Sequence, residues 1–200
     1  PLILISSTSV YTANSQEIDE SSPAISPSTP YAQCKLAEEE VVVESIARGL
    51  SAIIFRFGTI FGVSPGMRFH TAVNRFCWQA ALNEPLTVWE TAMDQTRPYL
   101  AVGDAVGAIS HVVLNGIYPG AVVNAATCNA TVRDVIDEIT ATGIDVRVKL
   151  VPSAAMTTNS YTTSTRRAEE LGFRFHGSLE DGVRETLKLL GGLTPARRLH

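Results

Sequence analysis

The chain has 200 residues, of which 45% are hydrophobic and 18% are charged, and its formal net charge is −4 at pH 7. This fits one globular domain, or a large part of a longer protein, with enough apolar side chains for a packed core. The acidic balance argues against nucleic-acid and anionic-membrane partners, which select for basic faces. No apolar run reaches the roughly 20 residues that span a bilayer, so we expect no membrane association.

The three cysteines, Cys34, Cys77 and Cys128, lie far apart and form no Cys-x-x-Cys pair. The sequence therefore predicts neither a disulfide framework nor a zinc site. The four histidines show no spacing typical of metal ligands, so no metal is expected. A reducing cytoplasm is the expected compartment.

The chain opens with a strand, a helix and a second strand. Leu2–Ser6 is a short apolar run, typical of a strand covered on both faces. A helix is expected over 30–48, with Ser28 or Thr29 as its cap and a proline in its first turn. Ser51–Phe57 is again apolar, so the two strands should run parallel, joined by a right-handed crossover.

Helices and short strands alternate through the rest of the chain. Helices are expected near 70–82, 104–115, 131–142, 165–171 and 179–190, and strands near 86–89, 98–102, 121–125 and 146–151. This alternation predicts an α/β fold. In the helix at 30–48, the acidic run Glu38-Glu39-Glu40 is expected to face water for at least part of a turn.

Tyr31 and Lys35 stand four residues apart at the start of the first helix, so they project from one face. A nearby ammonium favours the phenolate over the phenol, and such a tyrosine can exchange a proton with a substrate hydroxyl. The spacing alone is common and fits a plain surface pair. However, Ser7 and Thr8 follow directly on the first strand, and the carboxyl ends of parallel strands are where such sheets bind ligands. The combination predicts a proton-transfer site.

Six segments extend this pattern along the chain: LISSTSVY, PYAQCKLAEEEV, FRFGTIFG, VNRFCWQAALNEPLTVW, QTRPYLAVGDAVGAI and RRAEELGFRFHGSLEDGVRETL. Together they resemble the extended short-chain dehydrogenase/reductases, in particular the NAD-dependent epimerase/dehydratase family that acts on nucleotide sugars. The resemblance implies the later part of a Rossmann-like doubly wound parallel sheet plus a small mixed α/β substrate-binding lobe. Residues 1–62 would belong to the dinucleotide-binding domain and carry the catalytic residues. Residues 63–200 would be mainly the substrate-binding lobe, with 98–125 returning to the core sheet.

The resemblance also implies roles for single residues. Tyr31 would be the catalytic acid/base, Lys35 would favour the tyrosinate and bind the nicotinamide ribose, and Ser7 would hold the sugar hydroxyl that is oxidised. The residues expected to contact the cofactor, NAD or NADP, are Ser7, Tyr31, Lys35, Phe57 and Gly58. Those expected to contact a nucleotide-sugar substrate are Thr8, Thr59, Arg68, Asn74 and Arg97. Arg97 would grip the diphosphate; its plainer interpretation is a surface ion pair with Asp94 or Asp104.

Thr8 and Ser9 stand where the family's dehydratases carry an Asp-Glu pair, and neither can serve as a carboxylate acid or base. The resemblance therefore favours an NAD-dependent sugar-nucleotide epimerase. One alternative is a reductase or dehydrogenase of the same superfamily that acts on a non-nucleotide substrate. A second alternative, from another class, is a cofactor-free binding or scaffold fragment.

The family's cofactor half begins with a glycine-rich turn of the form G-x-x-G-x-x-G, and this sequence contains none. We therefore expect the 200 residues to be a fragment that is inactive alone and binds NAD weakly or not at all. The resemblance further implies a homodimer formed through the helix at 30–48, whose Val41-Val42-Val43 run adds apolar surface.

Overall fold

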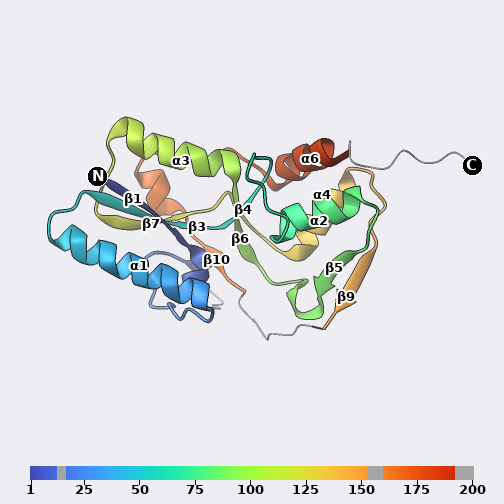
Figure 1. The fold of residues 1–200 in the computed structure, drawn as a ribbon, viewed down its shortest axis with the longest axis horizontal. Helices are drawn as coiled ribbons and strands as arrows, with labels where there is room; N and C mark the ends of the chain where they lie inside the picture. The colour runs from blue at the N-terminus through green and yellow to red at the C-terminus, as the bar shows by residue number, and fades with distance from the viewer. Residues whose placement is uncertain (13–16, 153–159, 192–200) are drawn as a thin grey trace, which may run out of the picture.

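The structure is a computed structural model that describes residues 1–12, 17–152 and 160–191 (Figure 1). Its helices are α1 (Pro30–Ala47), α2 (Ala72–Ala81), α3 (Val102–Asn115), α4 (Val132–Ala141), α5 (Arg166–Glu170) and α6 (Leu179–Leu190). Its strands are β1 (Leu2–Ser7), β2 (Glu17–Ile18), β3 (Ala52–Phe57), β4 (Thr59–Phe61), β5 (Leu86–Trp89), β6 (Arg97–Ala101), β7 (Ala121–Ala125), β8 (Cys128–Ala130), β9 (Val148–Val151) and β10 (Thr162–Thr163). The mixture of helices and parallel strands confirms the α/β class.

The main sheet has the order β1-β3-β7, and all three strands are parallel. In Figure 1, α1 runs along one side of this sheet and α3 along the other. The side chains of β3 alternate between the two faces, as a strand requires. Ile53 and Phe55 pack in the cluster that includes α3, while Ala52 and Ile54 pack in the cluster that includes α1. This two-sided burial explains why the strand reads as a continuous apolar run.

Local signals fix the start of α1, the helix that carries Tyr31. Thr29 is its N-cap, and the Thr29 hydroxyl oxygen accepts a hydrogen bond from the Ala32 amide at 3.2 Å. Pro30 occupies the first turn, where a missing N–H costs nothing. At the other end, Gly49 has a φ of 100°, a left-handed conformation that favours glycine. The expected helix at 30–48 is confirmed.

A second core lies around α2, α4 and α6, which pack with the mixed sheet β4-β6-β8. In that sheet β4 is parallel to β6, whereas β8 is antiparallel to it. The strand pair β5-β9 lies at the edge of this part in Figure 1. Within the described ranges, no helix combines the length and the apolar character needed to cross a bilayer.

Four short strands, β2, β4, β8 and β10, were not predicted because two or three residues carry no periodic signal. The change from β3 to β4 takes place at Gly58, whose amide donates to the Ala125 carbonyl at 2.9 Å. A Cβ at Gly58 would lie 2.9 Å from the Pro98 carbonyl oxygen. Glycine is thus required there, because the chain leaves one sheet for the other against the backbone of β6.

Candidate active site

A cavity of about 700 Å³ opens at the carboxyl ends of β1 and β3. It brings together every predicted site residue except Lys35: Ser7, Thr8, Tyr31, Phe57, Gly58, Thr59, Arg68, Asn74 and Arg97. These residues come from five separate stretches of the chain. The parallel register of β1 and β3 places the strand ends Ser7 and Phe57 side by side.

The hydroxyl run forms a tight turn at one wall of this cavity. Ser7 is the last residue of β1 and caps the 3-10 turn Thr8–Val10, where its Oγ accepts a hydrogen bond from the Ser9 amide at 3.1 Å. Because the Oγ accepts from the protein, its own proton is available for a ligand. The Ser9 hydroxyl is buried with no hydrogen-bond partner among the described residues.

Tyr31 lies in the first turn of α1 and is 58% exposed, so its phenol is accessible from the cavity that it lines. Lys35 lies one turn further along the same helix. The Lys35 Nζ donates to the Ile5 carbonyl at 3.1 Å and to the Glu38 carboxylate at 2.8 Å. The ammonium therefore ties α1 to β1 and, with three donors in all, retains one for a ligand.

A buried ion pair fixes α1 against the sheet behind the cavity. The Arg56 Nη2 lies 2.6 Å from a carboxylate oxygen of Glu39, and the Ser6 hydroxyl donates to the same carboxylate at 2.5 Å. Arg56 also donates to the Tyr11 hydroxyl at 2.8 Å, which in turn donates to Asn124 at 2.9 Å. Burial raises the pKa of Tyr11, although Arg56 acts in the opposite direction, so Tyr11 remains a protonated donor.

The side chain of Asn74, a predicted substrate residue, is hydrogen-bonded within the protein. Asn74 is buried; its side chain accepts from the Gly62 amide and donates to the Arg68 carbonyl, each at 3.1 Å. It therefore shapes the loop that carries Arg68.

Neither carboxylate expected as an ordinary partner of Arg97 is paired with it. Asp94 pairs with Arg133, and Asp104 accepts from Thr127 and the His176 amide. The Arg97 guanidinium is left for other contacts.

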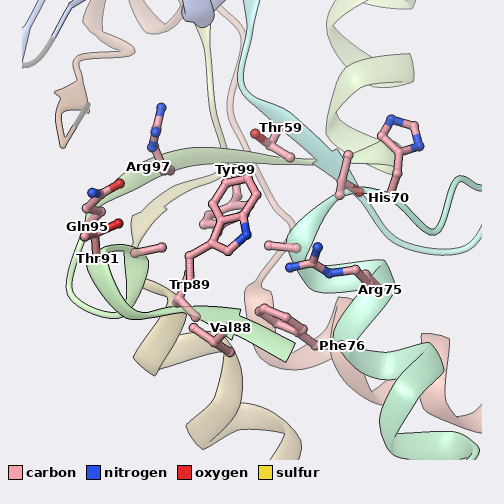
Figure 2. A pocket seen from close by; sticks show the side chains of 14 residues that line it. Thr59, His70, Arg75, Phe76, Val88, Trp89, Thr91, Gln95, Arg97 and Tyr99 are labelled. Carbon is pink, nitrogen blue, oxygen red and sulfur yellow. The ribbon is translucent and has the colours of Figure 1, made fainter. Parts of the chain in front are cut away.

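A second cavity of about 290 Å³ adjoins the first, and the two share Thr59, His70, Thr71 and Arg97. Figure 2 shows Trp89 in its middle, with the Arg75 guanidinium pointing toward the indole and Arg97 standing on the other side. Arg75 donates to the Thr87 carbonyl at 3.3 Å, and burial lowers its pKa. No Asp or Glu lines this cavity among the described residues, so the two arginines give it a positive character.

Sequence reasoning missed Arg75 and Tyr161, which line these two cavities. Arg75 lies on an amphipathic helix, where an arginine normally indicates a solvated face. Tyr161 lies outside every recognised segment. Arg75 does lie in the recognised segment VNRFCWQAALNEPLTVW, but nothing in that segment separates it from a surface arginine. Tyr161 carries no local signal.

Comparisons with known proteins agree with this geometry. The sequence profile of the NAD dependent epimerase/dehydratase family matches residues 1–126. A chloroplastic UDP-sulfoquinovose synthase from Spinacia oleracea is 34% identical over 126 residues, which make up 58% of this chain and 26% of that protein. This chain thus spans about a quarter of the length of that curated relative.

Solved structures show the same fold. MoeE5 in complex with UDP-glucuronic acid and NAD superposes with a TM-score of 0.82 at 26% identity, covering 93% of this chain and 63% of MoeE5. A UDP-glucuronic acid 4-epimerase from Bacillus cereus, in complex with UDP-glucuronic acid and NAD, gives 0.81 at 23% identity, covering 96% of this chain and 61% of that one. The structure of RMD from Pseudomonas aeruginosa complexed with NADPH gives 0.82 at 20% identity, covering 96% and 67%.

The predicted resemblance and the Rossmann-like fold are both confirmed by these matches. A family profile covers more than half of the chain. One cavity also holds a hydroxyl turn, an accessible tyrosine and Arg97, which pairs with no carboxylate among the described residues. The chain belongs to the NAD dependent epimerase/dehydratase family.

Proposed function

We propose that this chain carries the proton-transfer and substrate-binding residues of a nucleotide-sugar epimerase. The observation that carries the proposal is that Ser7, Tyr31 and Arg97 line one cavity at the carboxyl ends of β1 and β3. MoeE5, at 26% identity, was solved with UDP-glucuronic acid and NAD, which supports a UDP-sugar as substrate. Thr8 and Ser9 offer no carboxylate for an elimination, which favours epimerisation over dehydration.

In this proposal each side chain has a separate task. Tyr31 takes the proton of a sugar hydroxyl through its phenolate oxygen and later returns it. The Ser7 hydroxyl donates to the same sugar oxygen and holds it in line. Arg97 binds the diphosphate through its planar fork of donors. NAD, when bound, supplies the hydride acceptor. The residues present suit its nicotinamide end, because Tyr31, Phe57 and Gly58 line one cavity and Lys35, one turn from Tyr31 on α1, retains one donor.

Hydrogen bonds within the protein occupy the Asn74 side chain. Asn74 uses its amide to hold the Arg68 carbonyl, so we propose that it acts on substrate through the loop rather than directly. Thr59 and Thr8 line the same cavity and would bound the sugar. The nucleotide would extend past Arg97 into the adjoining cavity, where the Trp89 ring offers a stacking surface.

A product assay tests this function. The full-length protein is incubated with NAD and either UDP-glucose or UDP-glucuronic acid, and the sugar is followed by NMR. We expect the C4 epimer to appear without net formation of NADH. In Tyr31→Phe, turnover should fall by about 10²–10⁴-fold, the usual contribution of a general acid/base, while UDP binding is kept. Turnover that survives in Tyr31→Phe would refute the assigned role.

The same assay separates the alternatives. A reductase or dehydrogenase of this superfamily would consume or form NAD(P)H in proportion to a non-nucleotide ketone or alcohol. Its turnover would be unchanged in Arg97→Ala. A cofactor-free binding or scaffold fragment would show neither turnover nor NAD binding at full length. Tyr31 is accessible in the cavity that also holds Arg97, and no carboxylate in the described part of the chain pairs with Arg97. Both observations favour the epimerase over the two alternatives.

The two parts of the chain are also proposed to have different roles. We infer that residues 1–62 act with the cofactor and that residues 63–200 mainly bind substrate, with 98–125 returning to the core. The 200 residues alone should bind NAD weakly or not at all, because they contain no glycine-rich phosphate turn. Calorimetric titration of the 200-residue chain with NAD tests this, and tight saturable binding would contradict it.

We further propose that the protein forms a homodimer through α1. Val41 and Val43 are 63% and 49% exposed on this helix, and burying them would remove apolar surface from water. Light scattering of the full-length protein should give the mass of a dimer, and Val41→Asp should shift it toward the monomer. A monomeric wild-type protein would rule out this interface.

A further inference from the structure

Tyr161 lies between the two ends of the proposed substrate site. It is 4% exposed, and it reaches the cavity from a segment just before β10, far in the chain from Ser7 and Arg97. Its amide donates to the Thr96 carbonyl at 3.1 Å, so its backbone is fixed to the residue that precedes Arg97. Its ring packs edge-on against Tyr11, with centroids 6.3 Å apart.

One end of the Tyr161 side chain holds the hydroxyl turn. The Tyr161 hydroxyl donates to the Thr8 carbonyl at 2.9 Å. That carbonyl also accepts the Tyr11 amide at 3.1 Å, the hydrogen bond that closes the turn. Because Ser7 caps this turn, the Tyr161 hydroxyl sets where the Ser7 Oγ stands relative to the cavity.

The ring of Tyr161 holds Arg97. The Arg97 Cζ lies 5.6 Å from the ring centroid, within the range of a cation–π contact. Among the described residues no carboxylate pairs with this guanidinium. An ion pair would occupy its N–H donors, whereas a ring face fixes the group and leaves all five donors free for phosphate oxygens.

We propose that Tyr161 is a positioning residue that sets both Arg97, for the substrate diphosphate, and the Ser7 turn, for the reacting sugar. One rigid side chain therefore fixes the distance between the anchored and the reacting ends of the substrate. This rests on the proposed function, and it adds a determinant that belongs to neither end.

Two variants separate the two contacts. Tyr161→Phe keeps the ring over Arg97 and removes the hydrogen bond to Thr8, so kcat should fall while the Kd for UDP stays near the wild-type value. Tyr161→Leu also removes the ring, and the Kd for UDP should rise by about 2- to 30-fold, the range of a cation–π contact. Tyr11→Phe is the matched control: it removes a buried hydroxyl from the same aromatic cluster without touching Arg97, and the Kd for UDP should not change.

A double-mutant cycle distinguishes positioning from general destabilisation. UDP binding to the full-length protein is measured by calorimetry for Arg97→Ala, Tyr161→Leu and the double variant. If Tyr161 acts through Arg97, Tyr161→Leu adds nothing once Arg97 is gone. An equal rise in Kd with and without Arg97 would overturn the proposal. If Tyr161→Leu does not fold, Tyr161→Phe decides: a rise in its Kd for UDP, or an unchanged kcat, would overturn it.

The readouts keep this inference apart from the epimerase proposal. UDP that binds with the expected coupling, but without any epimerisation, supports the Tyr161 inference and sinks only the proposed reaction. Epimerisation with a UDP affinity that ignores Tyr161→Leu sinks only the inference. A wild-type protein that binds no UDP overturns the inference itself.

Discussion

Arg56 and Glu39 pair at 2.6 Å while each side chain is only 4% exposed. Glu39 lies one turn beyond Lys35 on α1, and Arg56 lies next to Phe57 at the end of β3. The pair therefore joins the helix that carries Tyr31 to the strand end that forms a wall of the cavity. The Ser6 hydroxyl completes the contact from β1, next to Ser7.

Breaking this pair should be costly. Glu39→Ala leaves the Arg56 charge buried without its carboxylate, and we expect the free energy of unfolding to fall by about 3–5 kcal/mol. Chemical denaturation measures it. The matched control is Glu170→Ala, which breaks the exposed pair with Arg166 and should cost about 0–1 kcal/mol. Equal effects of the two variants would mean that the buried pair contributes no more than a surface pair.

Lys35 offers a test of how the helix is tied to the sheet. Lys35→Met removes the Nζ, which donates to the Ile5 carbonyl and keeps one donor for a ligand. The rate of the proposed epimerisation should therefore fall by about 10²-fold or more. The Kd for UDP should not change, because Lys35 lies outside the cavity lining. Glu38→Gln is the control, since it removes only the exposed partner of the ammonium, and its rate should stay near wild type. A normal rate in Lys35→Met would remove Lys35 from the mechanism.

The elements that carry the proposed chemistry were predictable because their signals are local. The cap Thr29 and the proline Pro30 predict the start of α1. The hydroxyl run that begins at Ser7 directly follows an apolar strand. Glu39 differs from these elements. The sequence predicts that the run Glu38-Glu39-Glu40 faces water for at least part of a turn, yet of the three side chains only that of Glu39 is buried against the sheet. Its partner Arg56 lies within an apolar strand, and only the packing of α1 against the sheet brings the two side chains together.

Tyr161 is a second residue whose role could not be predicted from the sequence. Its hydrogen bond to Thr8 joins residues 153 positions apart, and no pattern in the sequence marks either side of it. The motifs indicated which residue types meet at the site. The side chains that fix the distances between them depend on tertiary contacts.

The cysteines should differ sharply in reactivity. Burial raises the pKa of Cys77 to about 12 and that of Cys128 to about 11, so at pH 8 both remain thiols, and the thiolate is the reactive form. Cys34 is exposed on α1. We expect one thiol per chain to react quickly with Ellman's reagent in the native state and all three in denaturant. Cys34→Ser should abolish the fast phase, and two fast thiols in the native protein would contradict the burial of the others.

Asp134 should make the free energy of unfolding depend on pH in the acid range. The Asp134 carboxylate accepts the backbone amide and the hydroxyl of Thr131, each at 2.7 Å, and these hydrogen bonds lower its pKa below the usual value. The stability that it contributes is therefore present above its unfolded pKa and lost as pH falls through its folded pKa. Denaturation from roughly pH 6 to pH 2 should show the stability difference between wild type and Asp134→Asn shrinking as the pH falls. Asp137→Asn, on the same helix, is the control, and a constant difference for Asp134→Asn would refute the linkage.

Gly182 in α6 packs against Phe61 more closely than any side chain allows. A Cβ there would lie 2.6 Å from the Phe61 Cδ2, and Phe61 is fully buried, so its ring has little room to move. Alanine is the better helix former by about 1 kcal/mol, but we expect the clash to dominate and Gly182→Ala to destabilise the protein by about 1–3 kcal/mol. Gly191→Ala, at the end of the same helix, is the control, because a Cβ there meets no described atom within 4 Å. It should be neutral or slightly stabilising, and a neutral Gly182→Ala would show that the α6 contact with β4 is looser than the packing indicates.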